Sequence, residues 1–209
     1  MKRKNGNNTW LYTICIALIA VVFGFLSFIP VNIEFIKPFT GYFNPTKLLS
    51  NLPLWIFTNC IIALYSHSEK TSMLNTTLFN IVCFVSYCLF SMILTHAMPK
   101  DMFLTWMLFT LIWMIFSYLV WSANRQDTKG WILSTILLAI LFSTCFTYTE
   151  NTISSTTILN FLLYVFLVVI LYKGTKETLI IVILSIILAL ILSKIKIQII
   201  FTKSAVNSN

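Results

Sequence analysis

The sequence predicts an all-α protein, a bundle of seven (alternatively six) transmembrane helices. Of its 209 residues, 58% are hydrophobic and only 10% are charged. A soluble domain carries about 25% charged residues. Apolar runs of spanning length, about 20 residues each, follow one another with short polar breaks between them. We therefore expect one integral membrane domain over residues 1–209, with no room for a soluble domain.

Each predicted span is an apolar run bounded by charged, proline-containing or glycine-containing turns. The spans cover about residues 10–29, 48–66, 73–95, 102–123, 130–148, 157–172 and 178–193. The first span follows a short basic lead that contains Lys2, Arg3 and Lys4. This run is too long for the apolar region of a signal peptide and no A-x-A site follows it, which predicts an uncleaved signal anchor.

The longest predicted connection, residues 30–47, is an extracytoplasmic interfacial loop. It contains Pro30, Pro38 and Pro45, so a spanning helix does not fit. Its aromatic residues are interspersed with Glu34 and Lys37, a composition that favours the headgroup zone. A lid or re-entrant element is the alternative, since long ordered loops often carry function.

Polar residues form stripes on the second, third and fourth spans. Asn51, Trp55 and Asn59 recur every four residues and share one helical face, which must point toward protein or water. The second span is therefore expected to be an inner helix, with the others packed around it. The stripes of the next two spans contain Thr76, Asn80, Cys83, Tyr87 and Ser91, and Trp106, Thr110, Trp113, Ser117 and Trp121.

The stripes have two interpretations. They can join helices to one another, as interhelical Ser, Thr and Asn hydrogen bonds commonly do. They can also line a pocket with aromatic walls and a few amides, suited to a neutral or amphipathic small molecule. The tryptophans at 106 and 121 fit an interfacial belt as well. The candidate ligand-binding residues are Asn51, Trp55, Asn59, Asn80, Tyr87 and Trp113.

The last two spans differ in polarity. The sixth is short and has Asn160 and Tyr164 one turn apart. The seventh is almost purely aliphatic, with Ser185 as its only interior polar residue, so we expect it to lie at the periphery and face lipid. The stretch 195–201 either extends this span or lies at the interface.

Basic residues predict a cytoplasmic N-terminus. With that orientation the inner segments hold eight Lys and Arg residues and the outer loops hold three. Seven spans place the lysines of the C-terminal tail outside, whereas six place them inside. Richness in Ile, Asn, Lys and Phe suggests an AT-rich bacterial genome, and hence a bacterial plasma membrane.

Charge and chemistry limit the function. The net charge of +8 comes from residues at span ends and tails, which meet lipid headgroups and do not indicate nucleic acid. No acidic residue is placed in mid-span, which argues against a proton-coupled carrier, a pump or a charged-ion channel. The five cysteines lie in apolar stretches, with no histidine at ligand spacing and no H-E-x-x-H motif. We therefore expect no catalytic residue, metal or cofactor, and a protein that is not an enzyme.

Two resemblances follow from particular residues. The proline-containing loop, the segment SNLPLWIF with Asn51 and Trp55, a short charged turn and a polar span resemble an uncharacterised bacterial membrane family, domain of unknown function number six-five-one-eight. That resemblance implies a membrane protein without an assigned activity. Length and span number are also similar to the substrate-binding subunits of energy-coupling-factor vitamin transporters, which have a pocket near the outer face. Their alanine-rich first helix, which docks the coupling subunit, is not evident in residues 13–28.

Two functions follow from these observations. The leading hypothesis is a small-molecule-binding or transport-associated membrane subunit without its own energy source. The alternative is an interaction, regulatory or immunity protein whose helices dock another membrane protein. The expected partners are thus the lipid bilayer and either a neutral or amphipathic small molecule or another membrane protein.

Overall fold

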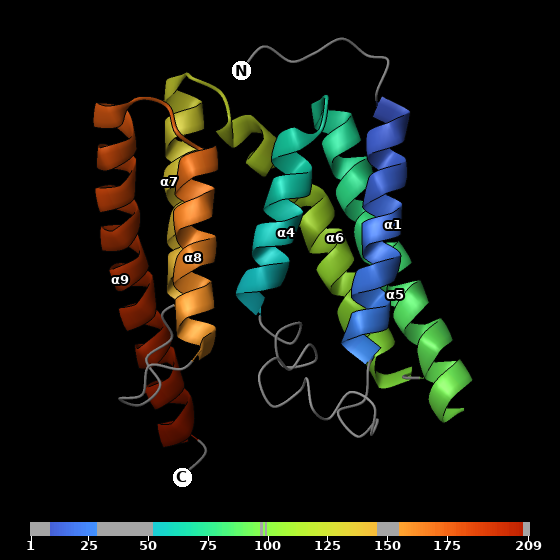
Figure 1. Cartoon of the computed structure of the whole chain (residues 1–209). Helices are drawn as coiled ribbons and strands as arrows, with labels where there is room; N and C mark the ends of the chain where they lie inside the picture. Colours follow the sequence, from blue (N-terminus) through green and yellow to red (C-terminus); the bar gives the residue numbers. More distant parts are fainter. Residues whose placement is uncertain (1–8, 29–51, 97, 99, 146–154, 207–209) are drawn as a thin grey trace. The chain divides into compact units, whose positions relative to one another are not determined.

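The computed structural model describes residues 9–28, 52–96, 98, 100–145 and 155–206, and most of these residues form α-helices, with no strand among them. The all-α class is confirmed (Figure 1). The helices are α1 (Thr9–Phe28), α4 (Leu52–Tyr65), α5 (Glu69–Thr95), α6 (Lys100–Ala123), α7 (Thr128–Cys145), α8 (Ser155–Ile170) and α9 (Thr175–Val206). The predicted loop at 30–47 lies outside the described residues.

Four helical segments are long and apolar enough to cross a membrane. They are Glu69–Leu94, Met102–Ala123, Thr128–Cys145 and Thr175–Leu192. The apolar parts of α1, α4 and α8 are shorter, at Leu11–Ser27, Leu52–Tyr65 and Ile158–Ile170. The chain is therefore a membrane protein by its helices, and the number of spans, seven or six, stays a prediction.

The helices belong to two compact units. Unit 1 is Met1–Ser122 and unit 2 is Ala123–Asn209. Within each unit successive helices reverse direction (Figure 1). The short turns between α4 and α5 and between α8 and α9 require this reversal.

Helix α4 is the inner helix of unit 1. Trp55 belongs to a buried cluster that also contains Ile62 of α4 and Phe79 of α5. Its contacts reach all three neighbours: Tyr12 of α1 donates a hydrogen bond to the Ile62 carbonyl at 3.2 Å, and Trp121 of α6 donates to the Ser66 carbonyl just after α4 at 3.1 Å. Within unit 1, α4 therefore contacts each of the other helices, in agreement with the inner position predicted for the second span.

Helices α1 and α5 pack more extensively than any other pair in unit 1. Gly24 makes this approach possible, because a Cβ atom there would lie 2.5 Å from the Cys83 carbonyl oxygen and 2.7 Å from the Cβ atom of Ser86. Small residues allow membrane helices to approach closely, and close approach increases the dispersion attraction between their backbones. Gly24 therefore fixes where α1 crosses α5.

Ser68 and Thr71 cap the start of α5. The Thr71 amide donates to the Ser68 hydroxyl at 3.2 Å, and the Ser68 amide donates to the Thr71 hydroxyl at 2.7 Å. This reciprocal pair satisfies backbone donors that a helix start leaves unpaired. It also fixes the short connection from α4 to α5.

Unit 2 packs α7 against both α8 and α9. The hydroxyls of Tyr164 on α8 and Ser185 on α9 lie 3.1 Å apart, and Ser185 is fully buried. Ser185 itself therefore has a protein partner, whereas many large side chains of α9, such as Leu179, Ile183 and Ile187, are exposed, as expected for a helix that faces lipid. A serine in an otherwise aliphatic helix finds a protein partner, because hydrocarbon offers none. Helix α9 also continues through 195–201. Whether this stretch extends the span or lies at the interface stays a prediction.

Candidate functional site

The predicted polar stripes meet at a pair of amides between α4 and α5. The Asn80 Nδ2 atom donates to the Asn59 Oδ1 atom at 2.9 Å, and the Asn59 Nδ2 atom lies 3.5 Å from the Asn80 Oδ1 atom. Each amide also donates one turn back along its own helix, Asn59 to the Trp55 carbonyl and Asn80 to the Thr76 carbonyl. Both asparagines are fully buried. Their polar groups bind other protein groups, which agrees with the interpretation that the stripes join helices to one another.

A second polar chain joins α1, α5 and the end of α4. The Thr13 hydroxyl donates to the Asn75 Oδ1 atom at 3.0 Å, and the Asn75 Nδ2 atom donates to the Ser66 hydroxyl at 3.0 Å. The Ser66 hydroxyl in turn donates to the Ile62 carbonyl at 2.7 Å. Asn75 lies next to the predicted stripe of the third span rather than on it, and the partner Thr13 belongs to a helix with no polar stripe.

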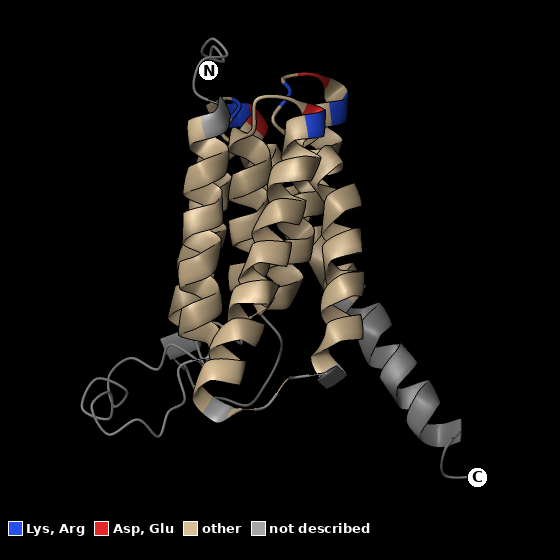
Figure 2. Ribbon diagram, turned by 90° about the vertical axis from the view of Figure 1, so that its right-hand side faces the viewer, with Lys and Arg blue, Asp and Glu red and all other residues tan. Residues whose placement is uncertain are grey.

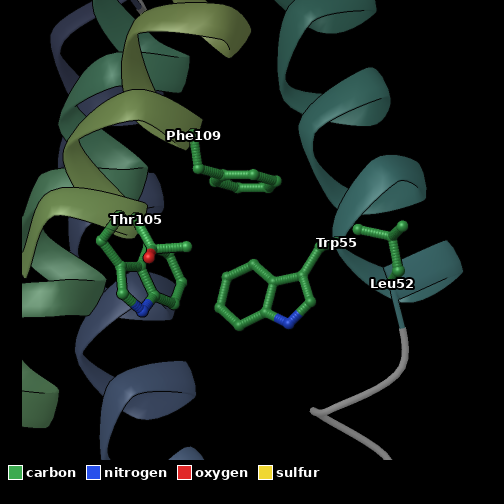
Figure 3. A pocket seen from close by; sticks show the side chains of 5 residues that line it. Leu52, Trp55, Thr105 and Phe109 are labelled. Carbon is green, nitrogen blue, oxygen red and sulfur yellow. The ribbon is translucent and has the colours of Figure 1, made fainter. Parts of the chain in front are cut away.

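An aromatic cavity lies between α4 and α6, and it is the candidate site. Its volume is about 140 Å³, and it is open on one side. Trp55 and Leu52 project from α4 toward Thr105 and Phe109 of α6 (Figure 3). Trp106 completes the lining, and its ring centroid lies 5.1 Å from that of Trp55 in an edge-to-face arrangement. The Thr105 hydroxyl and the indole N–H groups are the polar groups of a lining that is otherwise apolar.

The aromatic wall extends beyond the cavity. The Trp55 ring contacts Phe23 of α1 with a centroid distance of 6.0 Å, and Phe23 contacts Phe79 at 5.8 Å. On the other side Phe109 contacts Trp113 at 6.1 Å. Edge-to-face pairs of this kind stabilise packing by about 0.5–1.5 kcal/mol each beyond their buried area. Trp55 and Phe109 therefore each pack against a further aromatic ring that is not part of the cavity lining.

The structure separates the candidate ligand-binding residues. Trp55 lines the cavity, whereas Asn59 and Asn80 bind each other. Trp113 is buried against Phe109 and a further ring of α6, Phe116.

Two candidates remain. Tyr87 is half-buried on α5, and its backbone amide lies beside Gly24. Asn51 lies outside the described residues. The tryptophans considered for an interfacial belt both have protein partners, Trp106 in the cavity and Trp121 at the Ser66 carbonyl.

Sequence reasoning missed Leu52, Thr105 and Phe109 as lining residues. Leu52 and Phe109 are apolar side chains in apolar runs. In a membrane helix the sequence does not distinguish an apolar residue that faces lipid from one that lines a cavity. Thr105 immediately precedes Trp106, so only the contact between Trp55 and Trp106 could have pointed to it. That contact joins different helices and is invisible to periodicity.

Cysteines and metal-ligating residues do not form a second site in the described part of the chain. Cys60, Cys83 and Cys145 are buried, whereas Cys15 is exposed on α1 and Cys88 is half-buried. Among the residues that the structure describes, no three His, Cys, Asp or Glu side chains come together as metal ligands would.

A charged cluster in unit 2 lies at the turns rather than inside the helices. The Gly130 amide donates to the Asp127 carboxylate at 2.8 Å, and this hydrogen bond, aided by Arg125, lowers the pKa of Asp127. The Lys173 ammonium donates to the Arg125 carbonyl at 2.5 Å. Partial burial lowers the pKa of Lys173 to about 8, and the negative charge of Asp127 opposes that shift.

Comparison with known proteins adds no relative. No family model, no curated protein and no solved structure matches the chain. The fold and the candidate site together define a helical membrane protein with an aromatic cavity in unit 1.

Proposed function

We propose that this chain is a multi-pass plasma-membrane protein that binds a neutral or amphipathic small molecule through the cavity between α4 and α6. It acts as a binding or transport-associated subunit without its own energy source, and not as an enzyme. The observation that carries the proposal is the open aromatic lining of Trp55, Trp106 and Phe109. Ligand pockets are typically apolar and aromatic, with few polar groups that fix orientation.

The size of the cavity limits what it holds. Pockets for drug-sized ligands measure about 300–1,000 Å³, whereas this cavity measures about 140 Å³. It therefore takes one ring or a short acyl segment. The rest of an amphipathic ligand lies outside the opening, along exposed apolar residues of α6 such as Met102 and Leu108.

The same size supports a second candidate, a docking protein. One side chain from a transmembrane helix of another protein fills a cavity of this volume, and burial of such an anchor typically dominates an interface. Purification in mild detergent separates the two candidates. A co-purified organic molecule supports ligand binding, and a stoichiometric protein without such a molecule supports docking.

A filling substitution tests the cavity itself. Thr105→Phe places a ring in the opening, while Leu104→Phe adds a similar ring at a neighbouring position that is 66% exposed. The probe is N-phenyl-1-naphthylamine, a neutral fluorescent aromatic amine that accepts energy transfer from tryptophan. Saturable binding that Thr105→Phe weakens at least tenfold and Leu104→Phe leaves unchanged is expected. Equal binding by both variants would contradict the proposal.

We also propose that the N-terminus is cytoplasmic. The excess of Lys and Arg on the predicted inner segments supports this orientation. In a cysteine-free background, Gly41→Cys and Gln126→Cys should react with an impermeant reagent from opposite sides. Labelling of both from one side would overturn the orientation, and a reporter after Asn209 distinguishes seven spans from six.

A further inference from the structure

Two turns of unit 2 meet at one end of its helices. One turn precedes α7 and the other joins α8 to α9, and the hydrogen bond from Lys173 to the Arg125 carbonyl connects them. Gly130 leaves room for this contact, because a Cβ atom there would collide with the Arg125 carbonyl and lie 2.8 Å from the Lys173 Nζ atom. The turns thus form one surface, at the end where charged residues gather (Figure 2).

The acidic side chains of this surface are engaged locally. The Asp127 carboxylate accepts from the Gly130 amide with one oxygen and lies 3.2 Å from the Arg125 Nε atom with the other. The Glu177 carboxylate folds back over Gly174, where it occupies the space a Cβ atom would need. Both acids therefore serve the starts of α7 and α9, where negative charge is favourable.

Three of the four basic side chains of the same surface are exposed, and the fourth, Lys173, is half-buried at the Arg125 carbonyl. Lys129 and Lys176 are exposed, and the Arg125 side chain is 57% exposed. We call Arg125, Lys129, Lys173 and Lys176 the basic rim. Its four positive charges exceed the two negative charges of Asp127 and Glu177, which leaves the surface at +2.

An apolar belt begins one helical turn from the rim. Ile132, three residues after Lys129, is 56% exposed, and Leu179, three residues after Lys176, is 59% exposed. One turn rises about 5.4 Å, so rim and belt lie at neighbouring depths. Tyr172 beside the rim is also exposed, and tyrosine favours the membrane–water interface. The rim is therefore placed at headgroup depth.

We propose that the basic rim binds the headgroup phosphates of anionic lipids in the leaflet that adjoins it. The charge excess attracts the phosphates, and the neighbouring belt holds the acyl chains of the same lipids. Soluble phosphates lack the second contact, so the partner is the lipid and not a free phosphate. This inference concerns unit 2 and is independent of the cavity in unit 1.

The test uses the full chain in nanodiscs of equal parts phosphatidylglycerol and phosphatidylcholine, followed by native mass spectrometry of the released protein. Phosphatidylglycerol should be retained preferentially. Lys129→Gln/Lys176→Gln should lower that preference by about 25-fold, since each basic residue near an anionic surface contributes about fivefold. Lys129→Arg/Lys176→Arg should preserve it. The matched control is Lys37→Gln/Lys47→Gln, which removes equal charge from the predicted outer loop.

Three outcomes would overturn the inference. The first is equal retention of both lipids by the unaltered chain. The second is an equal loss of preference in the control variant, which would show an effect of net charge alone. The third is displacement of phosphatidylglycerol by millimolar glycerol phosphate, which would indicate a site for free phosphates. Circular dichroism of each variant distinguishes lost lipid from lost fold.

Discussion

Asn59 and Asn80 face each other across two helices, and each amide is both donor and acceptor for the other, at 2.9 and 3.5 Å. Each also donates to a carbonyl of its own helix. An asparagine amide has two N–H donors and one carbonyl oxygen. The hydrogen-bonding groups of both amides are therefore satisfied by protein partners alone, without water.

The first prediction is that removal of both amides destabilises unit 1 less than the two single changes do together. Asn80→Leu leaves the Asn59 carbonyl without its donor, which costs about 1–3 kcal/mol for a buried group. Asn59→Leu/Asn80→Leu removes both partners and should cost less than the two single changes together. Thermal unfolding in detergent measures the stability of the two single variants and the double variant, which together form a double-mutant cycle. Ile81→Leu, at an exposed position, is the control. Strict additivity would mean that the amides do not interact.

The second prediction is that Gly24→Ala loosens the pairing of α1 with α5. The added methyl group meets the Cys83 carbonyl and the Ser86 side chain, so the helices must separate. Overpacking of this kind costs about 1–3 kcal/mol. Val22→Ala, at a position that is 52% exposed, should have little effect on the melting temperature in detergent. An unchanged melting temperature for Gly24→Ala would show that the close approach is not required.

The third prediction concerns Ser185. Ser185→Ala deprives the buried Tyr164 hydroxyl of its partner on α9, which should lower stability by about 1 kcal/mol. Tyr164→Phe/Ser185→Ala should recover part of that loss, because both polar groups are then absent. Ile187→Leu, at an exposed position of the same helix, serves as control. If Ser185 faced lipid, its replacement by alanine would be neutral or stabilising.

The fourth prediction concerns the pH dependence of Lys173. Its pKa of about 8 lies below the ordinary value of 10.5 because the ammonium is partly buried. Between these values the unfolded chain binds more protons at Lys173 than the folded chain does. This group therefore makes stability rise as pH increases from about 8 to about 10.5, with a small amplitude because Lys173 is half-exposed.

Competitive acetylation followed by mass spectrometry measures this titration. The labelling midpoint of Lys173 should lie near pH 8. Asp127→Asn should move it to lower pH, because the Asp127 carboxylate raises the pKa of Lys173. A midpoint above pH 10 in the unaltered chain, or a shift to higher pH in the variant, would contradict the assigned cause.

The all-α class and the inner position of α4 could be predicted from the sequence for one physical reason. Hydrocarbon penalises unpaired polar groups, so the spacing of Trp55 and Asn59 on one face predicts which face meets protein. For the same reason Asn80 is expected in the interior, where the structure has it. Its partner could not be predicted, because helical periodicity describes one helix at a time.

The cavity and the packing of α1 were beyond this reasoning. Helix α1 has no polar stripe, yet Tyr12 donates a hydrogen bond to α4 and Thr13 donates one to α5. The partners are far apart in the sequence, so helical periodicity does not reveal these contacts. The cavity depends on how closely α4 approaches α6 at Trp55 and Trp106, which side-chain hydropathy does not encode. The contact of Ser185 with Tyr164 could not be predicted either, because the aliphatic neighbours of Ser185 give no sign of a polar partner on another helix.

The pairing of α1 with α5 sets an order of assembly during synthesis. Thr13 and its partner Asn75 are 62 residues apart, so α1 leaves the ribosome well before its main neighbour exists. At about 5–20 residues per second this interval lasts about 3–12 s. During that interval the face of α1 around Gly24 stays available to lipids, to insertion factors or to α4. A nascent chain arrested before α5 emerges should therefore leave the Gly24 face of α1 open to exchanging partners, a state that later elongation ends.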